Sequence, residues 1–370
     1  MGYNNKMRNN IGKEKQRVLV FINSEVGGAE RMSVIIAKML EDEFNIKYVI
    51  LRNEKYKETT TSIVNFLSYD DEILFLSNTG HFDKLKKLYR VIKSQKPDIV
   101  FSSHYNINDK ILFLRPLLRG IKFIIRAENS YSTFDNIKKY IIRHTYNKAD
   151  VMITQTDEMR KDFIENGCLP ESKIITLENP VDIETIEQKV KGQTSPYPED
   201  GKKHVVAVGR FHPQKGYDFL VRSLAKIRET QKDVELYIIG SFLGQWQSEY
   251  EKIMRMSEQL RVKDFIHCLG FNDNPFVYVK YADCFVLSSR FEGLPNVLVE
   301  SLYLKTPVAA FKCIPIIERM VRDGVDGYLA EKENSDSLAT AISNALKMGR
   351  TSPVYSGATK EDFVNLFKES

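Results

Sequence analysis

The stretch SRFEGLPNVLVES, residues 289–301, sets the expectations for the rest of the chain. It follows a short apolar run, Cys284 to Leu287, that is typical of a buried strand. Gly293 and Pro295 come next, at a junction where a tight turn needs Gly and a first helical turn tolerates Pro. The apolar positions that follow are spaced like one face of a helix: Val297, Leu298, Leu302 and Leu304. The pattern therefore predicts a strand, a turn and a helix.

Two glutamates belong to this stretch. Glu292 lies just before the start of the predicted helix, and Glu300 lies within the helix. A helix N-terminus offers unpaired N–H groups and the positive end of a dipole, which suits an anion or a polar sugar. The alternative is an ordinary strand, turn and helix whose acids are solvated. The stretch alone leaves both interpretations open.

The composition favours two domains and excludes a dedicated nucleic-acid binder. The chain has 370 residues, 42% hydrophobic content and a net charge of only +5. Residues 1–180 hold 29 Lys and Arg against 23 Asp and Glu, whereas residues 181–370 hold 25 against 26. The basic first half favours an acidic partner, either a phosphate-bearing acceptor or an anionic membrane surface. A lysine-rich solvated surface is the alternative.

The four cysteines have no paired spacing, which predicts reduced, buried thiols in a cytoplasmic protein rather than disulfides or a zinc site. No apolar run approaches the ~20 residues that cross a bilayer. Residues 1–16 are polar and rich in Asn and Lys, so we expect a disordered lead-in without a signal core.

The first half alternates strands with helices. The apolar run 17–23 predicts a strand covered on both faces, and Gly27 and Gly28 form a glycine loop before a helix. The loop matches neither a P-loop nor a GxGxxG fingerprint. A helix is predicted over 82–94, and further strands at 48–51, 98–102, 122–126, 150–154 and 173–177. This pattern predicts an α/β doubly wound domain over residues 17–182.

The second half repeats the architecture after a polar segment, residues 183–203, that we expect to be a linker. Strands are predicted at 205–208, 234–239, 265–269, 284–287 and 307–311, and helices at 217–229, 248–260, 276–281 and 335–348. Residues 204–350 therefore form a second doubly wound domain. Residues 351–370 form a C-terminal segment with one short helix.

Two cations stand in the loop after the first strand of the second domain. Arg210 and Lys215 are five residues apart, between Gly209 and Gly216. Arg supplies a planar fork and Lys a mobile point charge, so the two can converge on one diphosphate without a metal. Two ordinary surface cations are the alternative.

His104 and Glu128 follow strands of the first domain, where ligands bind in open parallel sheets. Either side chain could bind a substrate hydroxyl or act as an acid or base, and His104 could equally be structural. No His has metal-ligand spacing, and no GxSxG, HExxH or Asp-x-Asp motif appears. These absences argue against a serine hydrolase, a zincin and a metal-dependent sugar transferase.

Taken together, these motifs resemble the retaining nucleotide-sugar glycosyltransferases of family 4, which have the GT-B fold. The resemblance covers nearly the whole chain after residue 16. It is carried in order by Gly27-Gly28-Ala29-Glu30, Asn179-Pro180-Val181-Asp182, Val208-Gly209-Arg210 with Lys215-Gly216, Glu292 with Glu300, and Glu318 with Asp326-Gly327-Tyr328-Leu329.

The resemblance implies a role for each matched residue. Arg210 and Lys215 would hold the donor diphosphate, Glu300 would accept from the ribose hydroxyls, and Glu292 would sit by the donor sugar. Gly209 belongs to the diphosphate loop, and the residues Gly293, Leu294, Pro295 and Asn296 would offer backbone N–H groups. Gly27 and Gly28 would let the first domain close over the donor, and Gly240 and Phe271 would line the base pocket. His104 and Glu128 would lie on the acceptor side.

The resemblance further implies metal-independent transfer, with retention, from a nucleoside diphosphate sugar to a glycan or lipid-linked acceptor in cell-surface polysaccharide synthesis. A UDP-sugar is favoured, no cofactor is implied, and the protein would act in the cytoplasm or at the inner face of the membrane. The C-terminal helix would return to the first domain. The chain departs from the family at Arg126-Ala127-Glu128, where a His is common, and at Cys313-Ile314-Pro315, which replaces a Gly-rich stretch. An epimerase or phosphorylase of the same fold, and a non-catalytic sugar-nucleotide-binding protein, are the alternatives.

Overall fold

The computed structural model describes residues 15–23, 28–52, 67, 72–77, 81–352 and 357–369. The chain forms two compact units. Unit 1 comprises Met1–Pro180 with Ala358–Ser370, and unit 2 comprises Val181–Gly357. Most of the predicted lead-in, residues 1–16, and the predicted donor residue Gly27 lie outside the described residues.

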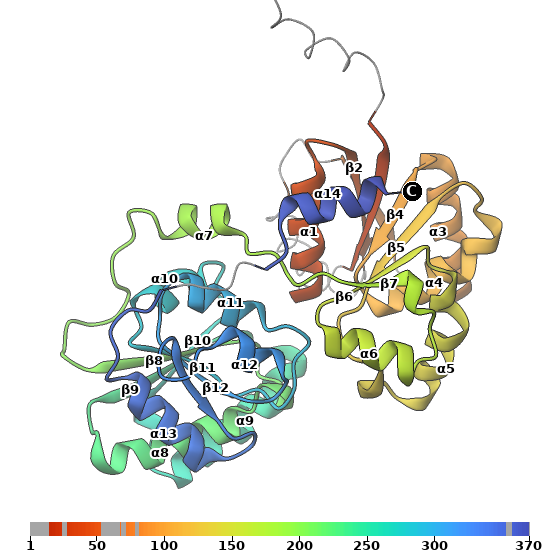
Figure 1. Ribbon diagram of the computed structural model, residues 1–370. Coiled ribbons are helices and arrows are strands. Elements are labelled where there is room, and N and C mark those ends of the chain that lie inside the picture. The colour runs from red at the N-terminus through yellow and green to blue at the C-terminus, as the bar shows by residue number, and fades with distance from the viewer. Residues whose placement is uncertain are drawn as a thin grey trace, which may run out of the picture. The chain divides into compact units, whose positions relative to one another are not determined.

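Unit 1 is built on a parallel sheet with the order β3-β2-β1-β4-β5-β6-β7 (Figure 1). Its first strand buries successive side chains on opposite faces, which is why the run 17–23 is apolar throughout. The strand order reverses between β1 and β4. The strands are β1 (Arg17–Asn23), β2 (Asn45–Arg52), β3 (Glu72–Ser77), β4 (Ile99–Ser102), β5 (Lys122–Arg126), β6 (Val151–Thr154) and β7 (Ile174–Thr176).

Helices cover both faces of this sheet. One face packs against α1 (Gly28–Leu40) and the C-terminal α14 (Lys360–Lys368). The other packs against α3 (His81–Gln95), α4 (Tyr105–Leu114), α5 (Asn136–Thr145) and α6 (Asp157–Glu165). The sheet with both faces covered confirms the α/β doubly wound class that the strand pattern predicts.

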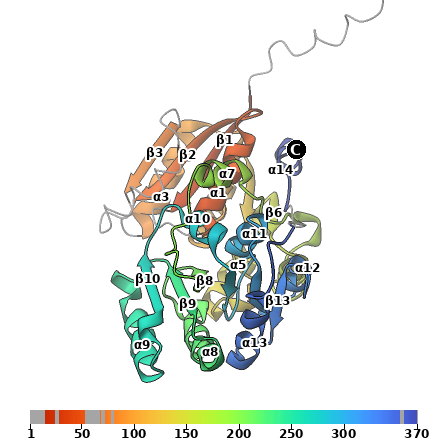
Figure 2. The same ribbon diagram turned by 90° about the vertical axis from the view of Figure 1, so that its left-hand side faces the viewer.

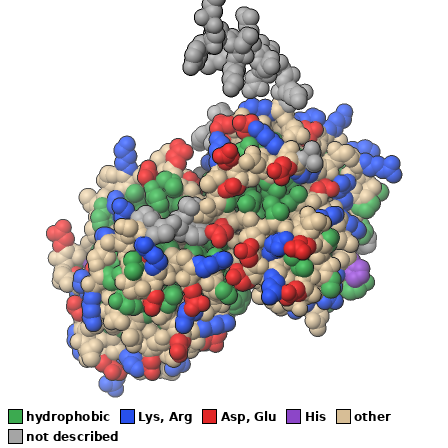
Figure 3. Space-filling model, in the orientation of Figure 1, with side chains coloured by type: hydrophobic (Ala, Val, Ile, Leu, Met, Phe, Trp, Pro, Cys, Tyr) green, Lys and Arg blue, Asp and Glu red, His purple; other side chains and the backbone are tan. Residues whose placement is uncertain are grey.

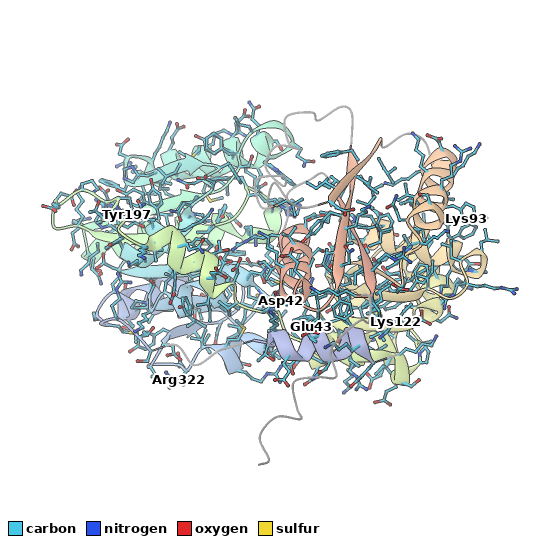
Figure 4. All side chains as sticks on the ribbon, turned by 90° about the horizontal axis from the view of Figure 1, so that it is seen from above. Asp42, Glu43, Lys93, Lys122, Tyr197 and Arg322 are labelled. Carbon is cyan, nitrogen blue, oxygen red and sulfur yellow. The ribbon has the colours of Figure 1, made fainter. Side chains whose placement is uncertain are left out.

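The C-terminal helix α14 is part of unit 1, beside α1 (Figure 4). Phe367 is buried, with its ring centroid 6.0 Å from that of Phe44 and 5.4 Å from that of Phe101. Two polar contacts flank this aromatic packing. Lys368 pairs with Glu43 at 2.7 Å, and the Lys122 amine donates to the Leu366 carbonyl at 2.9 Å. Residues 358–369 therefore complete a core that begins 340 residues earlier, at Val18.

Unit 2 has a second parallel sheet, in the order β10-β9-β8-β11-β12-β13. The order reverses between β8 and β11. The strands are β8 (Lys203–Val208), β9 (Val234–Ile239), β10 (Ile266–Gly270), β11 (Cys284–Leu287), β12 (Val308–Phe311) and β13 (Gly327–Ala330).

Figure 2 shows the two helical layers of unit 2 on either side of these strands. One layer consists of α8 (Tyr217–Thr230), α9 (Gln247–Gln259) and α13 (Ser335–Ala345). The other consists of α10 (Pro275–Tyr281), α11 (Asn296–Tyr303) and α12 (Ile316–Met320). Each layer has its own buried apolar cluster against the sheet.

The polar segment 183–203, which we expected to be a linker, is instead folded onto unit 2. It contains α7 (Ile183–Val190), whose first turn is capped by the Asp182 side chain accepting from the Thr185 N–H at 3.1 Å. Farther along, Tyr197 is buried and its hydroxyl donates to the Tyr278 carbonyl at 2.9 Å. The composition misled the prediction because a few buried side chains anchor an otherwise polar segment.

The four cysteines are free, but only Cys284 is fully buried and Cys168 is exposed, so the expectation of buried thiols is wrong for Cys168. Within the described ranges, no helix combines the length and the apolar character needed to span a bilayer.

Candidate active site

The candidate site lies where the sheet of unit 2 reverses its strand order. In open parallel sheets, the loops that leave the carboxyl ends of the two strands at this point diverge and leave room for a ligand. Here the two loops are residues 209–216, after β8, and residues 288–295, after β11. They contain Arg210, Lys215, Glu292 and Gly293, so the topology brings two separately predicted motifs together.

Hydrogen bonds to backbone carbonyls fix these two loops against each other. The Ser288 hydroxyl donates to the Lys215 carbonyl at 2.8 Å, and the Arg290 N–H donates to the Gln214 carbonyl at 2.7 Å. Gly216 has φ +62°, and a Cβ there would lie 2.1 Å from the Ser288 carbonyl oxygen. Only glycine tolerates both the left-handed conformation and this close approach.

Lys215 and Glu292 form an ion pair between the loops. Lys215 Nζ lies 2.8 Å from Glu292 Oε1, and the two side chains are 19% and 9% exposed. The Ser289 hydroxyl donates to the same carboxylate oxygen at 2.6 Å, and Gln214 Nε2 donates to the Phe291 carbonyl at 2.9 Å. The Glu292 carboxylate therefore holds the Lys215 amine at a defined position, and the Ser289 hydroxyl in turn fixes the carboxylate.

Arg210 is placed differently from Lys215. Its guanidinium lies over the ring of Trp246, 4.9 Å from the centroid, and its side chain is exposed. His212 lies beside the same indole and caps the short helix Pro213–Lys215, because its Nδ1 accepts the Gln214 N–H at 3.1 Å. Burial lowers the pKa of His212, and the charges of Arg210 and Lys215 lower it further. The charges of Arg210 and Lys215 thus both act on the His212 imidazole.

The predicted backbone donors before α11 need one correction. Leu294 is buried in the apolar cluster of this face and Pro295 is buried beside it in sequence, so their side chains are not available to a ligand. Pro295 also has no N–H, so it cannot donate as expected. Asn296 opens α11, whose first turn has no side-chain cap among the described residues, and Glu300 stands one turn farther on. For Gly293, Leu294 and Asn296, donation of the backbone N–H to a ligand stays a prediction.

Gly240 and Phe271 lie farther along the same sheet edge, at the ends of β9 and β10. The Gly240 N–H donates to the Gly270 carbonyl at 2.8 Å, and the Phe271 ring is 61% exposed. The Gly209 N–H donates to the Ile239 carbonyl at 2.8 Å, so the ends of β8, β9 and β10 are linked. An exposed aromatic ring at this edge offers a surface for stacking.

Cys313 replaces the expected glycines close to Glu292. Burial raises the pKa of the Cys313 thiol to about 12, with the Glu292 carboxylate adding to the effect. The thiol is therefore neutral at physiological pH and is not a nucleophile.

In unit 1 the strand order reverses between β1 and β4, and His104 follows β4. His104 caps α4, because its Nδ1 accepts the Asn106 N–H at 3.2 Å. Its Nε2 lies 3.8 Å from Glu30 Oε1 of α1, the helix that Gly28 begins. Burial lowers the pKa of His104 to about 4, and the charges of nearby lysines contribute. His104 is therefore neutral and partly structural.

Glu128 lies next to this pair. One of its carboxyl oxygens accepts the Tyr105 N–H at 3.1 Å. Burial raises the pKa of Glu128 to about 8, and the negative charge of Glu30 raises it as well. Glu128 is therefore largely protonated at neutral pH and can donate a hydrogen bond, whereas a role as a general base does not suit it.

Several side chains in these sites were missed by the sequence analysis. Ser289 and Gln214 flank the predicted glutamate and lysine but carry no signal by themselves. Trp246 could have been noticed because it is the only Trp in the chain. Glu30 belongs to the predicted glycine-loop motif, but its contact with His104 depends on the strand order, which the sequence does not give.

No group of three or more His, Cys, Asp or Glu within the described part of the chain is arranged to hold a metal ion. Metal independence remains a prediction.

Two family models match the chain. "Glycosyltransferase Family 4" matches residues 26–185, and "Glycosyl transferases group 1" matches residues 193–361. Together the models cover both units and both candidate sites.

Two curated relatives illustrate the similarity. An uncharacterized glycosyltransferase of Methanocaldococcus jannaschii is 28% identical over 289 residues, which cover 74% of this chain and 66% of that protein. The second is N-acetylgalactosamine-N,N'-diacetylbacillosaminyl-diphospho-undecaprenol 4-alpha-N-acetylgalactosaminyltransferase of Campylobacter jejuni. It is 24% identical over 360 residues, which cover 93% of this chain and 94% of that protein.

Among solved structures, Alr3699/HepE of Anabaena in complex with UDP and glucose has a similar fold. The TM-score is 0.75, with 18% sequence identity and 90% of each chain covered. At this identity the similarity concerns the fold.

Proposed function

This chain belongs to the family 4 glycosyltransferases with the GT-B fold, and we propose that it moves a sugar from a nucleoside diphosphate sugar to a glycan or lipid-linked acceptor. We further propose that the transfer retains the configuration of the sugar and needs no metal or other cofactor. The acceptor would belong to cell-surface polysaccharide synthesis, at the cytoplasmic face of the membrane.

One observation carries the proposal: the Lys215–Glu292 pair at the point where the sheet of unit 2 reverses its order. A lysine ammonium at this edge can approach phosphate oxygens of a ligand bound between the loops. The carboxylate holds the amine in place between the two loops. When the diphosphate binds, it supplies a second anion to the same amine.

The remaining roles follow from position. Arg210, stacked on Trp246, would provide the planar fork for the second phosphate. Glu300, one turn into α11, would accept from the ribose hydroxyls, and Glu292 would contact the donor sugar. α11 begins just after the loop that leaves the carboxyl end of β11, and a helix N-terminus at such a place favours an anion.

The proposed reaction needs no dedicated base. The acceptor hydroxyl oxygen forms a bond to the anomeric carbon on the face from which the diphosphate leaves, and the carbon–oxygen bond to the phosphate breaks. The acceptor proton passes to the departing phosphate oxygen. Lys215 and Arg210 stabilise the negative charge that develops on the diphosphate, which is electrostatic stabilisation by groups already in place.

The names of similar proteins support the choice of substrates. The Anabaena structure contains UDP and glucose, and the name of the Campylobacter relative specifies a diphospho-undecaprenol-linked acceptor and an α-linkage. We therefore propose a UDP-sugar donor and a lipid-linked or glycan acceptor for this chain.

A transfer assay tests the proposal. Purified protein is incubated with a panel of UDP-sugars and lipid-diphosphate or glycan acceptors, in EDTA, and the anomeric configuration of the product is read by NMR. We expect the product to keep the α-configuration of the donor. An inverted product would disprove retention, complete loss in EDTA with recovery on addition of Mn²⁺ would disprove metal independence, and release of a free epimerised sugar would favour the epimerase.

A further inference from the structure

The three helices α3, α4 and α5 carry an unusual excess of positive charge. They cover one face of the sheet of unit 1. Residues 81–119 and 136–148, which span them, hold thirteen Lys and Arg against three Asp and Glu, whereas the net charge of the whole chain is only +5. The excess is therefore local to this helical layer.

The three acids do not offset this charge on the outer surface, because each is already paired. Asp83 lies 2.7 Å from Lys87, Asp98 accepts the Arg17 N–H at 2.7 Å, and Asp109 pairs with Lys138. In contrast, Lys86 and Arg90, one turn apart on α3, are exposed and form no ion pair with any described residue.

Large apolar side chains are exposed on the same layer. We define the α4–α5 patch as Phe113, Leu117, Ile137 and Tyr140, which are 61%, 67%, 77% and 66% exposed. Ile137 and Tyr140 are three residues apart on α5 and share one face of that helix. Phe113 lies near the end of α4, and Leu117 lies in the short 3-10 turn that follows it. Exposed apolar side chains grouped in this way mark an interaction surface.

One cation contacts a side chain of this patch, and an ion pair links the two helices that carry it. The Lys148 amine, in the turn after α5, lies 6.0 Å from the centroid of the Phe113 ring. Lys138 connects α5 to α4 through Asp109 and lies 4.4 Å from the centroid of the Tyr105 ring. In Figure 3, hydrophobic side chains lie among Lys and Arg side chains on the flank of unit 1 formed by these helices. Lys93 of α3 extends outward from the end of the helix in Figure 4.

We propose that this layer, the α4–α5 patch with the cations of α3, α4 and α5, binds the surface of a bilayer that contains anionic lipid. Charge complementarity selects this partner: the cations match phosphate headgroups, and the apolar side chains can enter the boundary between headgroups and acyl chains. The inference does not depend on the proposed function, because it concerns an outer helical layer and needs neither donor nor acceptor.

Liposome flotation tests the proposal with the full chain. We compare vesicles of phosphatidylcholine alone with vesicles that also contain phosphatidylglycerol, at low and high salt. Binding should require phosphatidylglycerol and fall with salt, because counterions screen the exposed charges. Each Lys or Arg near an anionic surface contributes about 1 kcal/mol, so replacing two should weaken binding about tenfold or more.

Two double variants test the two components of the surface separately, the positive charge of α3 and the apolar α4–α5 patch. Lys86→Glu/Arg90→Glu reverses two of the five cations of α3, and Phe113→Ser/Leu117→Ser removes half of the α4–α5 patch. The matched controls lie in unit 2: Lys232→Glu/Lys347→Glu at exposed lysines, and Ile183→Ser/Val325→Ser at exposed apolar residues. Circular dichroism verifies that each variant is folded.

We expect both unit 1 variants to lose binding and both unit 2 controls to retain it. Equal binding to neutral vesicles, unchanged binding by the unit 1 variants, or no binding of the wild type to either vesicle would overturn the proposal. Donor binding by the variants should stay at the wild-type level, so a failure of this proposal is distinguishable from a failure of the proposed function.

Discussion

Lys215 and Glu292 act as one unit, and their contributions to stability should therefore be coupled. The Glu292 side chain is only 9% exposed, so Lys215→Ala leaves a nearly buried carboxylate without its cation, with the Ser289 hydroxyl at 2.6 Å and Gln214 Nε2 at 3.5 Å as remaining donors. Removing one member of a buried ion pair costs about 3 kcal/mol. Urea unfolding of Lys215→Ala should show a loss of this order.

Adding Glu292→Gln to Lys215→Ala should restore part of that stability, because the uncompensated charge is removed. Equal unfolding free energies for the single and double variants would show that the pair is not coupled.

Gly240 should be far less tolerant of a side chain than an ordinary exposed glycine. A Cβ at this position would lie 1.9 Å from the Gly209 carbonyl oxygen, which is backbone and cannot move aside. Gly240→Ala should therefore destabilise unit 2 by about 2 kcal/mol or more, as overpacking does. Gly349→Ala is the control, since a Cβ there meets no atom within 4 Å. Similar unfolding midpoints for the two variants would contradict the close approach.

Glu128 should make the protein less stable as the pH rises from about 4.5 to about 8. Burial raises the pKa of Glu128 from the ordinary value of a glutamate to about 8, so the folded state keeps a proton that the unfolded state loses across this window. Glu128→Gln abolishes this titration and should raise the melting temperature at pH 8 more than at pH 5. A variant with the same pH dependence as the wild type would show that Glu128 is ionised in the folded protein.

At the scale of single residues, sequence reasoning located the charged members of the donor site but not their partners. Lys215 and Glu292 stand 77 positions apart, and their pairing depends on β8 and β11 being neighbours. Neither the strand order nor the Arg210–Trp246 contact is encoded locally. His104 was left between a functional and a structural role, and its capping of α4 now supplies a structural one.

Among the elements, α14 connects the end of the chain to the core of unit 1, so its aromatic residues should be costly to remove. Phe367 is 1% exposed and packs against Phe44 and Phe101. Phe367→Ala should cost about 3–5 kcal/mol, as large truncations in cores do. Val325→Ala, at a half-exposed position, is the control. A loss of less than 1 kcal/mol in chemical denaturation of Phe367→Ala would contradict the packing of α14 on unit 1.

The strands with continuous apolar runs were predicted almost to the residue. β1, β5, β9 and β11 have the expected bounds, because strands buried on both faces have a clear sequence signal. Elements with mixed faces were missed. The helix α6 is largely polar and buries only Met159 and Phe163, and β13 has four residues, two of them only partly buried. Their positions are determined by packing rather than by local pattern.

At the scale of the whole molecule, two repeats of one architecture could be inferred because both halves alternate strands with helices. The first domain was expected to end at residue 182 and unit 1 ends at Pro180, but the polar residues 183–203, which were expected to be a linker, belong to unit 2. The return of α14 to unit 1 also joins the two ends of the chain in one domain. These long-range features follow from a few buried side chains, such as Tyr197 and Phe367.

The central claim is that unit 2 binds a nucleoside diphosphate through Lys215 and Arg210. Isothermal titration of UDP, GDP and ADP into the full chain, in EDTA, tests it most directly. The account predicts that UDP binds more tightly than GDP or ADP. It also predicts that Lys215→Ala and Arg210→Ala each weaken the affinity for UDP tenfold or more, on the order of 1.4 kcal/mol of binding free energy. Lys232→Ala, at an exposed site, should bind like the wild type. Unchanged UDP affinity in both site variants, or binding of none of the three nucleotides by the wild type, would contradict the claim.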